Sequence, residues 1–182
     1  MTSKTSGPDA IASQIIYSVI ECPLGYLLLA TTDKGICTVS LGDTEIALST
    51  ALRNKFKHAV IIEKHNHHAD WLAPMLNLLE GKQTEVNLPL DIQGSAFQQR
   101  VWQALRTIPY GVTRTYQDIA RELDRPQAKR AVGSACGANP LALIIPCHRV
   151  LKSDGGLSGY RWGIERKRQL LAIEQGQLSL NI

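Results

Sequence analysis

The sequence predicts an α+β protein, in which a small sheet-and-helix domain over residues 1–90 precedes a mainly helical domain over residues 91–182. Short apolar runs separated by tight-turn residues dominate the beginning of the chain, and apolar residues at helical spacing dominate its second half. The chain has 182 residues, of which 44% are hydrophobic and 20% charged. That composition is ordinary for a globular protein and argues against a disordered chain or a fibre.

The amino-terminal half is expected to form a small antiparallel sheet followed by two helices. Residues 14–20, 26–31 and 35–41 are apolar runs, and the turn residues between them end in glycine, which supplies the positive φ of tight turns. Two segments then carry apolar residues at helical spacing, namely 44–56 and 68–79.

The second half is expected to be helical after a linker or short strand at 88–94. Ser95 suits the N-cap of a first helix, Thr115 the N-cap of a second, and Pro126 the first turn of a third. The tight connection at Asp124 between the second and third helices predicts a helix-turn-helix. Many helical hairpins of this kind bind no DNA, so the pattern alone leaves its role open.

The charge of the chain is distributed unevenly. Residues 1–93 carry 7 Lys+Arg against 10 Asp+Glu, whereas residues 94–182 carry 13 against 6. A half-chain this basic favours a polyanionic partner, nucleic acid first, although a solvated basic surface would have the same composition.

We expect a cytoplasmic protein, in the bacterial cytoplasm or nucleoid, with no membrane contact. The longest apolar runs, such as 141–146, fall far short of the roughly 20 residues that a membrane span needs. Residues 1–9, MTSKTSGPD, are small and polar, which is typical of a disordered tail rather than a secretory signal.

The four cysteines contain no CxxC pair, so we expect free thiols rather than a disulfide scaffold or a zinc ribbon.

The most informative stretch is IIPCHRV at 144–150. Cys147 and His148 would point to opposite faces of a regular strand, so a partnership between them needs a turn, which Pro146 favours. A base within reach and the nearby cation Arg149 would lower the pKa of the thiol and raise its thiolate fraction. For an isolated Cys-His pair, the alternative is a buried structural cysteine beside a surface histidine.

This stretch resembles the active-site signature of the O6-alkylguanine-DNA alkyltransferases, also called methylated-DNA-protein-cysteine methyltransferases. The resemblance covers residues 94–174 in order, with the spacing of the family, and is particularly strong to the carboxy-terminal domain of bacterial Ada. The further matching segments are GVTRTY at 111–116, KRAVG at 129–133, ANP at 138–140, SGYRWG at 158–163, and Glu174. Residues 1–90 resemble the family only in layout and lack the zinc-binding, phosphotriester-accepting module of Ada, so repair is expected and Ada-type transcriptional activation is not.

The resemblance implies a single-turnover DNA repair enzyme that transfers an alkyl group, mainly methyl, from O6 of guanine to Cys147. Whether O4 of thymine is also a substrate stays open. His148 would remove the thiol proton through a water, and Glu174 would hold the imidazole. Tyr116 would donate a hydrogen bond to the departing guanine. Because a thioether is not a leaving group here, each molecule would act once.

The implied partner is double-stranded DNA containing O6-alkylguanine, bound by a monomer through the minor groove. Arg130 would intercalate and replace the flipped nucleotide, Lys129 would meet phosphates, and Asn139 would fix the turn between the third helix and the cysteine loop. The small residues that would let this helix sit deep in the groove are Ala128, Ala131 and Gly133. The pocket positions implied are Pro146, Val150, Tyr160, Arg161 and Trp162.

Trp162 is expected to narrow the pocket, so that O6-methylguanine fits and O6-benzylguanine fits poorly. The alternative is that its indole turns outward and packs against the last helix.

No cofactor and no metal are expected. Cys22, His65, His67 and His68 offer suitable ligand atoms, but their spacing does not match the zinc site of some family members.

Two other functions remain as alternatives. A non-catalytic, alkyltransferase-like protein would bind the lesion with a related DNA-binding half, but such proteins replace the cysteine that this chain carries at Cys147. A cysteine hydrolase could use Cys147, His148 and Glu174. It would leave the helix-turn-helix and Arg130 without a role.

Overall fold

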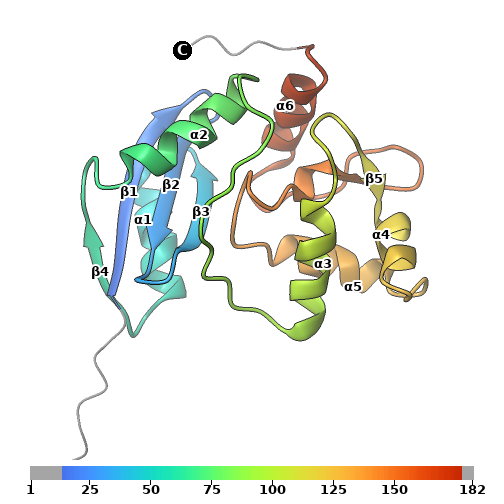
Figure 1. Cartoon of the computed structure of the whole chain (residues 1–182), viewed down its shortest axis with the longest axis horizontal. Coiled ribbons are helices and arrows are strands. Elements are labelled where there is room, and N and C mark those ends of the chain that lie inside the picture. Colours follow the sequence, from blue (N-terminus) through green and yellow to red (C-terminus); the bar gives the residue numbers. More distant parts are fainter. Residues whose placement is uncertain (1–13, 178–182) are drawn as a thin grey trace, which may run out of the picture.

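The computed structural model describes residues 14–177, in which a sheet-containing half lies beside a helical half (Figure 1). The expected tail at residues 1–9 lies outside the described residues. The elements of the first half are β1 (Gln14–Cys22), β2 (Gly25–Thr31), β3 (Ile36–Gly42), α1 (Glu45–Lys55), β4 (Val60–Glu63) and α2 (Ala69–Leu79). The second half contains α3 (Ala96–Arg106), β5 (Arg114–Thr115), α4 (Tyr116–Glu122), α5 (Lys129–Gly137), the 3-10 turn η1 (Cys147–Arg149), β6 (Val150–Leu151) and α6 (Ile164–Glu174). The predicted α+β fold class is confirmed.

The sheet has the strand order β3-β2-β1-β4. Its first three strands form the predicted antiparallel meander, and the first turn needs Gly25, whose φ is +103°. The sequence did not predict the fourth strand, β4, which pairs with β1 in parallel. β4 has only four residues, VIIE, and so short a segment shows no alternation of apolar and polar residues by which a strand is predicted.

Both faces of the sheet are buried, each against a different helix. Leu27 and Leu29 of β2 pack in the same core as Met75 of α2, whereas Leu28 of β2 packs in a second core with Leu52 of α1. This division follows from the alternation of side chains along a strand. It explains why the strands are nearly continuous apolar runs.

The edge of β3 joins the two halves. The amide of Val39 donates to the carbonyl of Pro140 at 3.0 Å, and the amide of Ala142 donates to the carbonyl of Val39 at 2.9 Å. On α6, the guanidinium of Arg166 donates to the carbonyl of Leu24 at 2.8 Å. The expected linker at 88–94 is mostly irregular, with one bridge to β3. The segment that follows Asn139 is therefore held by backbone bonds to the sheet.

The helical half begins as its capping residues predict. Ser95 and Gln98 form a capping box on α3, and Thr115 and Asp118 form one on α4. The prediction for Pro126 was wrong, since α5 starts three residues later, at Lys129.

The turn before α5 explains this difference. Asp124 has a φ of +56° and ends α4 in the left-handed region. The chain then makes one turn, in which the amide of Ala128 donates to the carbonyl of Arg125 at 2.8 Å, before α5 begins.

Within residues 14–177, no helix is both long and apolar enough to cross a membrane.

A buried histidine ties α2 to the sheet. The Nδ1 atom of His68 lies 2.9 Å from Oγ of Ser18, and Nε2 lies 2.9 Å from Oγ1 of Thr31. Since Ser18 gives its own proton to the carbonyl of Lys64, Nδ1 of His68 must donate, and Nε2 accepts from Thr31. Burial, followed by the charge of His67, lowers the pKa of His68 to about 4 from its ordinary value of 6.5.

The free energy of unfolding is expected to fall as the pH drops from 6.5 to 4. In that window the unfolded chain binds the proton that folded His68 rejects, so a depressed pKa gives stability that is complete above 6.5 and is lost towards 4. The loss is about 3 kcal/mol. Urea unfolding at several pH values checks this, with His68→Gln as the control that lacks the titrating ring. Parallel pH dependence in both proteins would contradict the assignment.

Candidate active site

Cys147 and His148 lie in the turn that the sequence requires. The amide of Cys147 donates to the carbonyl of Ile145 at 2.8 Å, and the amide of Arg149 donates to the carbonyl of Pro146 at 3.0 Å, which closes the 3-10 turn η1. The side chains of Cys147 and His148 are both buried, 3% and 0% exposed. The thiol is therefore shielded from bulk water.

Asn139 connects the thiol to helix α5. Its Nδ2 atom donates to Sγ of Cys147 at 3.1 Å and to the carbonyl of Ile145 at 2.8 Å, while its Oδ1 accepts from the amide of Leu141 at 2.9 Å. The amide of Asn139 in turn donates to the carbonyl of Cys136 near the end of α5. The side chain is completely buried, so it fixes the cysteine loop relative to α5.

His148 is held by a buried carboxylate on α6. Its Nε2 atom lies 2.7 Å from Oε1 of Glu174, and Arg149 donates to the same carboxylate through Nε at 2.8 Å and Nη2 at 2.9 Å. Burial would raise the pKa of Glu174, but the hydrogen bonds from His148 and Arg149 outweigh burial and lower it to about 2. An ionised Glu174 can only accept, so Nε2 of His148 carries the proton and Nδ1 is left as an acceptor. Within residues 14–177, Nδ1 has no hydrogen-bond partner.

The expectation that Arg149 lowers the pKa of the thiol was wrong. Its guanidinium donates hydrogen bonds to the carboxylate of Glu174, and its Nη1 atom donates to the carbonyl of Ile108 at 2.6 Å. Burial raises the pKa of Cys147 to about 11, against the opposing effects of the Asn139 hydrogen bond and the charge of Lys167. Burial lowers the pKa of His148, although Glu174 opposes this. At neutral pH the resting pair is thus a thiol and a neutral imidazole able to accept a proton.

Cys147 lies in the wall of a cavity of about 580 Å³. From helix α5 the wall includes Lys129, Arg130 and Gly133, so the cavity opens beside the third helix of the helical half. Ala128 is half-buried and Ala131 is exposed, and neither lines the cavity. The other lining residues are Tyr116, Gln117, Cys136, Gly137, Lys152, Ser153, Ser158, Gly159, Tyr160 and Arg161.

Three of the five expected pocket positions lie elsewhere. Tyr160 and Arg161 line the cavity, whereas Pro146, Val150 and Trp162 do not. Trp162 is 7% exposed and packs edge-on behind Tyr160, with ring centroids 5.1 Å apart. The indole, expected in the pocket wall, therefore does not line this cavity. Tyr160 and Trp162 lie in a turn that the amide of Gly163 closes on the carbonyl of Tyr160 at 3.0 Å, and Tyr160 occupies the wall while Trp162 packs against it.

The sequence did not single out Ser158, Lys167 or Cys136 as residues of this site. Lys167 is completely buried, with Nζ bonded to the carbonyl of Val150 at 2.7 Å and to Oγ of Ser158 at 3.1 Å. Lysines are usually exposed, and Lys167 lies in the charged run ERKR of α6. Nothing in that run marks one cation as buried. Cys136, which the sequence predicted only to be a free thiol, lines the cavity with Cys147.

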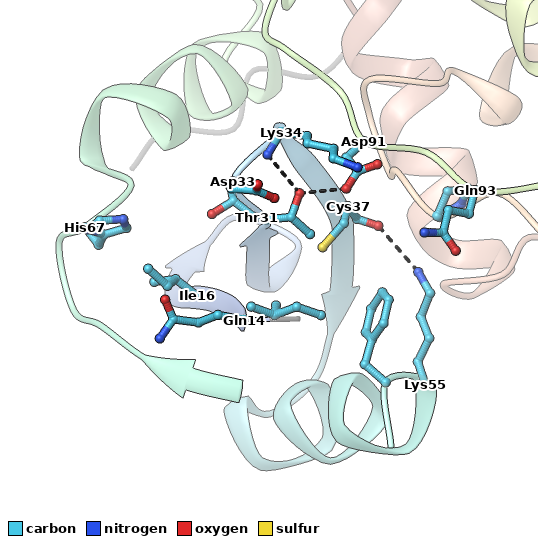
Figure 2. Close-up of a pocket in the computed structure, with 14 residues that line it drawn as sticks. Gln14, Ile16, Thr31, Asp33, Lys34, Cys37, Lys55, His67, Asp91 and Gln93 are labelled. Atoms are coloured by element: carbon cyan, nitrogen blue, oxygen red, sulfur yellow. Dashed lines mark hydrogen bonds between the residues drawn. The ribbon is translucent and has the colours of Figure 1, made fainter. Parts of the chain in front are cut away.

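A second cavity, of about 940 Å³, lies in the amino-terminal half (Figure 2). It contains Cys37 and Lys55, whose Nζ donates to Oγ1 of Thr38 at 2.9 Å. The thiol of Cys37 donates to the carbonyl of Ala30 at 3.4 Å, and burial raises its pKa. The wall also includes His67, Asp33 and Asp91, but among the described residues no hydrogen bond joins this imidazole to a carboxylate. We therefore assign the reactive site to the cavity of Cys147.

Among the described residues, no three His, Cys, Asp or Glu side chains are grouped so that they could hold a metal ion. His68, one of the candidate ligands, uses both ring nitrogens on Ser18 and Thr31.

The sequence matches two family models that together cover most of the chain. Residues 15–92 match the ribonuclease-like domain of 6-O-methylguanine DNA methyltransferase, and residues 96–176 match the DNA-binding domain of 6-O-methylguanine DNA methyltransferase.

Among curated proteins, the chain is 48% identical over 174 residues to the bifunctional transcriptional activator/DNA repair enzyme Ada of Escherichia coli, covering 96% of this chain and 49% of that protein. It is 39% identical over 163 residues to the methylated-DNA–protein-cysteine methyltransferase of Mycolicibacterium paratuberculosis, covering 88% and 93%. The chain thus spans about half the length of the Ada proteins it matches.

Solved structures from Mycobacterium tuberculosis have the same fold. An O6-methylguanine methyltransferase superposes with a TM-score of 0.76 at 36% identity, covering 92% of this chain and 96% of the other. A structure described as OGT in complex with DNA superposes with a TM-score of 0.74 at 38% identity, covering 89% and 94%.

Proposed function

Because the chain belongs to the 6-O-methylguanine DNA methyltransferase family, we propose that it repairs duplex DNA by moving an alkyl group, mainly methyl, from O6 of guanine to Sγ of Cys147. The observation that carries the proposal is the position of Cys147. It is held by Asn139 in the wall of a cavity that Lys129 and Arg130 border. A thiol at the bottom of a cationic opening suits a substrate that is part of a polyanion.

The chemistry follows from the protonation states of the resting site. The thiol proton moves to Nδ1 of His148 through a water, since the two residues make no direct hydrogen bond among the described contacts. The thiolate attacks the alkyl carbon and forms the S–C bond, while the C–O bond breaks and leaves its electron pair on guanine. Glu174 stabilises the imidazolium through Nε2. The product thioether cannot be displaced, so each chain reacts once.

Lesion recognition is assigned to helix α5. The O6 substituent of a stacked base is out of reach of a buried thiol, so the nucleotide must be flipped at a cost of a few kcal/mol. Arg130 is exposed on the first turn of α5 and borders the cavity, where its side chain can replace the flipped base in the stack.

We propose O6-alkylguanine in duplex DNA as the partner and a monomer as the active form. We also propose a cytoplasmic location and a division between the two domains at residues 90 and 91.

Analysis of the DNA product tests this proposal. Increasing amounts of protein are incubated with a duplex carrying one O6-methylguanine, and the digested DNA is analysed by chromatography. We expect guanine to replace O6-methylguanine mole for mole with the protein. Binding without conversion would indicate a non-catalytic lesion-binding protein, and conversion of many lesions per chain would indicate a true catalyst such as a hydrolase.

The position of Trp162 behind Tyr160 gives a prediction about selectivity. Trp162→Phe keeps an aromatic ring behind Tyr160 and should leave the ratio of the rates for O6-benzylguanine and O6-methylguanine unchanged, while the smaller ring lowers the free energy of unfolding by about 1–3 kcal/mol. Single-turnover rates and urea unfolding check the two parts. A shift of the rate ratio at unchanged stability would mean that Trp162 itself limits the pocket.

A further inference from the structure

Two cysteines line the reactive cavity. Besides Cys147 in η1, the wall contains Cys136 on helix α5, and the two side chains are 3% and 6% exposed. Both are free thiols. A buried cysteine usually serves as a small apolar side chain, but Cys136 borders the space that the proposed substrate enters. A second sulfur nucleophile therefore shares this space with the first.

Asn139 and the electrostatics of the site place the two thiols near one another. The amide of Asn139 donates to the carbonyl of Cys136 at 3.2 Å, and Nδ2 of the same residue donates to Sγ of Cys147 at 3.1 Å. Burial, followed by the charge of a Cys147 thiolate, raises the pKa of Cys136 to about 12. One residue thus contacts both cysteines, and the charge of one sulfur acts on the other.

Cys136 is not the first acceptor of an alkyl group. At neutral pH it is a thiol, whereas the nucleophile in sulfur chemistry is the thiolate. His148 directly follows Cys147 in η1, but among the described contacts no imidazole or carboxylate is hydrogen-bonded to Cys136. Cys136 therefore becomes reactive only when a positive charge beside it favours its thiolate form.

A bifunctional alkyl group produces such a charge. Transfer of a 2-haloethyl group from O6 of guanine leaves a 2-haloethyl thioether on Cys147. The thioether sulfur displaces the halide, which leaves with the electron pair of the carbon–halogen bond, and a three-membered sulfonium ring forms. This ring is a cation in the cavity wall, so it favours the thiolate of Cys136 and offers it an electrophilic carbon. A methyl group has no second leaving group and stops at Cys147.

We propose that Cys136 is a second alkyl acceptor, which converts the product of 2-haloethyl transfer into a thioether bridge between Cys147 and Cys136. This inference rests on the proposed function and names O6-(2-haloethyl)guanine as the substrate class. Cys136 attacks a ring carbon, the bond from that carbon to the sulfonium sulfur breaks, and its electron pair returns to Sγ of Cys147. The thiol proton passes to water, so the second step releases one halide ion and one proton.

The two-carbon bridge suits two thiols that share a wall without being bonded. It spans more than the roughly 2 Å of a disulfide bond, so it joins sulfur atoms that do not touch. Without Cys136, the sulfonium ring reacts with water or with a nucleophilic base nitrogen of the bound DNA, and the second reaction joins the protein covalently to DNA. Cys136 competes with both from within the cavity.

The mass of the intact protein tests the bridge. The wild type reacts to completion with a freshly prepared duplex carrying O6-(2-chloroethyl)guanine, in a reducing agent that keeps disulfides open. We expect a gain of about 26 Da, because C₂H₄ replaces two thiol hydrogens. Cys136→Ala and Cys136→Ser should gain about 44 Da instead, since water opens the ring and leaves a hydroxyethyl group on Cys147. Cys37→Ala, the matched control, removes the thiol of the other cavity (Figure 2) and should give the wild-type gain.

Fragmentation of the tryptic peptide locates the bridge. No Lys or Arg separates Cys136 from Cys147, so one peptide holds both, and a bridge removes the fragments produced by cleavage between them. A wild-type gain of about 44 Da, a gain of about 62 Da from an intact chloroethyl group, or a gain of about 26 Da that persists in Cys136→Ala would overturn the proposal. A wild type that takes no methyl group from an O6-methylguanine duplex would instead overturn the proposed function.

Discussion

Cys147→Ala and Cys147→Ser are expected to accept no alkyl group while binding duplex DNA with nearly the wild-type affinity. The thiol supplies the nucleophile but is 3% exposed, so it contributes almost no contact area to DNA. Serine keeps a hydrogen-bonding atom for Asn139 but is far less nucleophilic at neutral pH, since its hydroxyl is harder to deprotonate than a thiol. Stoichiometric transfer assays and binding titrations with the same duplex measure the two properties separately.

Cys37→Ala provides the control for this experiment. It removes a buried thiol in the other cavity, so full transfer is expected. Residual transfer by Cys147→Ala would show that another residue accepts the alkyl group, and loss of DNA binding in both Cys147 variants would show that the thiol position supports the DNA-binding surface.

Arg130→Ala is expected to slow repair of a duplex lesion by roughly 10- to 100-fold, which corresponds to losing part of the few kcal/mol needed to keep a nucleotide flipped. The reaction with the free base O6-methylguanine needs no flipping, so its rate should be nearly unchanged. Arg130 is exposed and borders the cavity without contributing to the Asn139–Cys147 contact, so the substitution leaves the reactive group intact.

Arg168→Ala is the matched control for Arg130, since it removes the same charge from α6, where Arg168 pairs with Glu165. It should weaken neither reaction. Equal slowing of the duplex and free-base reactions by Arg130→Ala would rule out the intercalating role and assign Arg130 to the pocket.

Secondary structure was predictable where local signals were strong. The capping residues Ser95 and Thr115 and the turn glycine Gly25 each act through hydrogen bonds or backbone angles within a few residues. β4 could not be predicted, because its pairing with β1 depends on a partner more than forty residues away. Pro126 misled the prediction for a local reason, since the left-handed backbone of Asp124 is followed by a turn that delays the start of α5 to Lys129.

The reactive residues could be named from the sequence, but their electrostatics could not. Neighbouring positions in the chain suggested that Arg149 acts on Cys147, whereas the fold turns Arg149 towards Glu174. Lys167 lies twenty residues from Cys147 in the sequence, and its burial depends on how α6 packs against η1 and β6. Trp162 illustrates the same limit, because only the path of the backbone decides whether it or Tyr160 faces the cavity.

The central claim is that Cys147 accepts one alkyl group per chain. Mass spectrometry of the intact protein after reaction with an excess of O6-methylguanine duplex, followed by peptide mapping, tests it most directly. We expect a single adduct of about 14 Da on Cys147, because a methyl group replaces the thiol proton and the net gain is one CH₂. No Lys or Arg separates Cys136 from Cys147, so fragmentation of the peptide must locate the adduct. An adduct on Cys136, or a repaired duplex with an unmodified protein, would contradict the account.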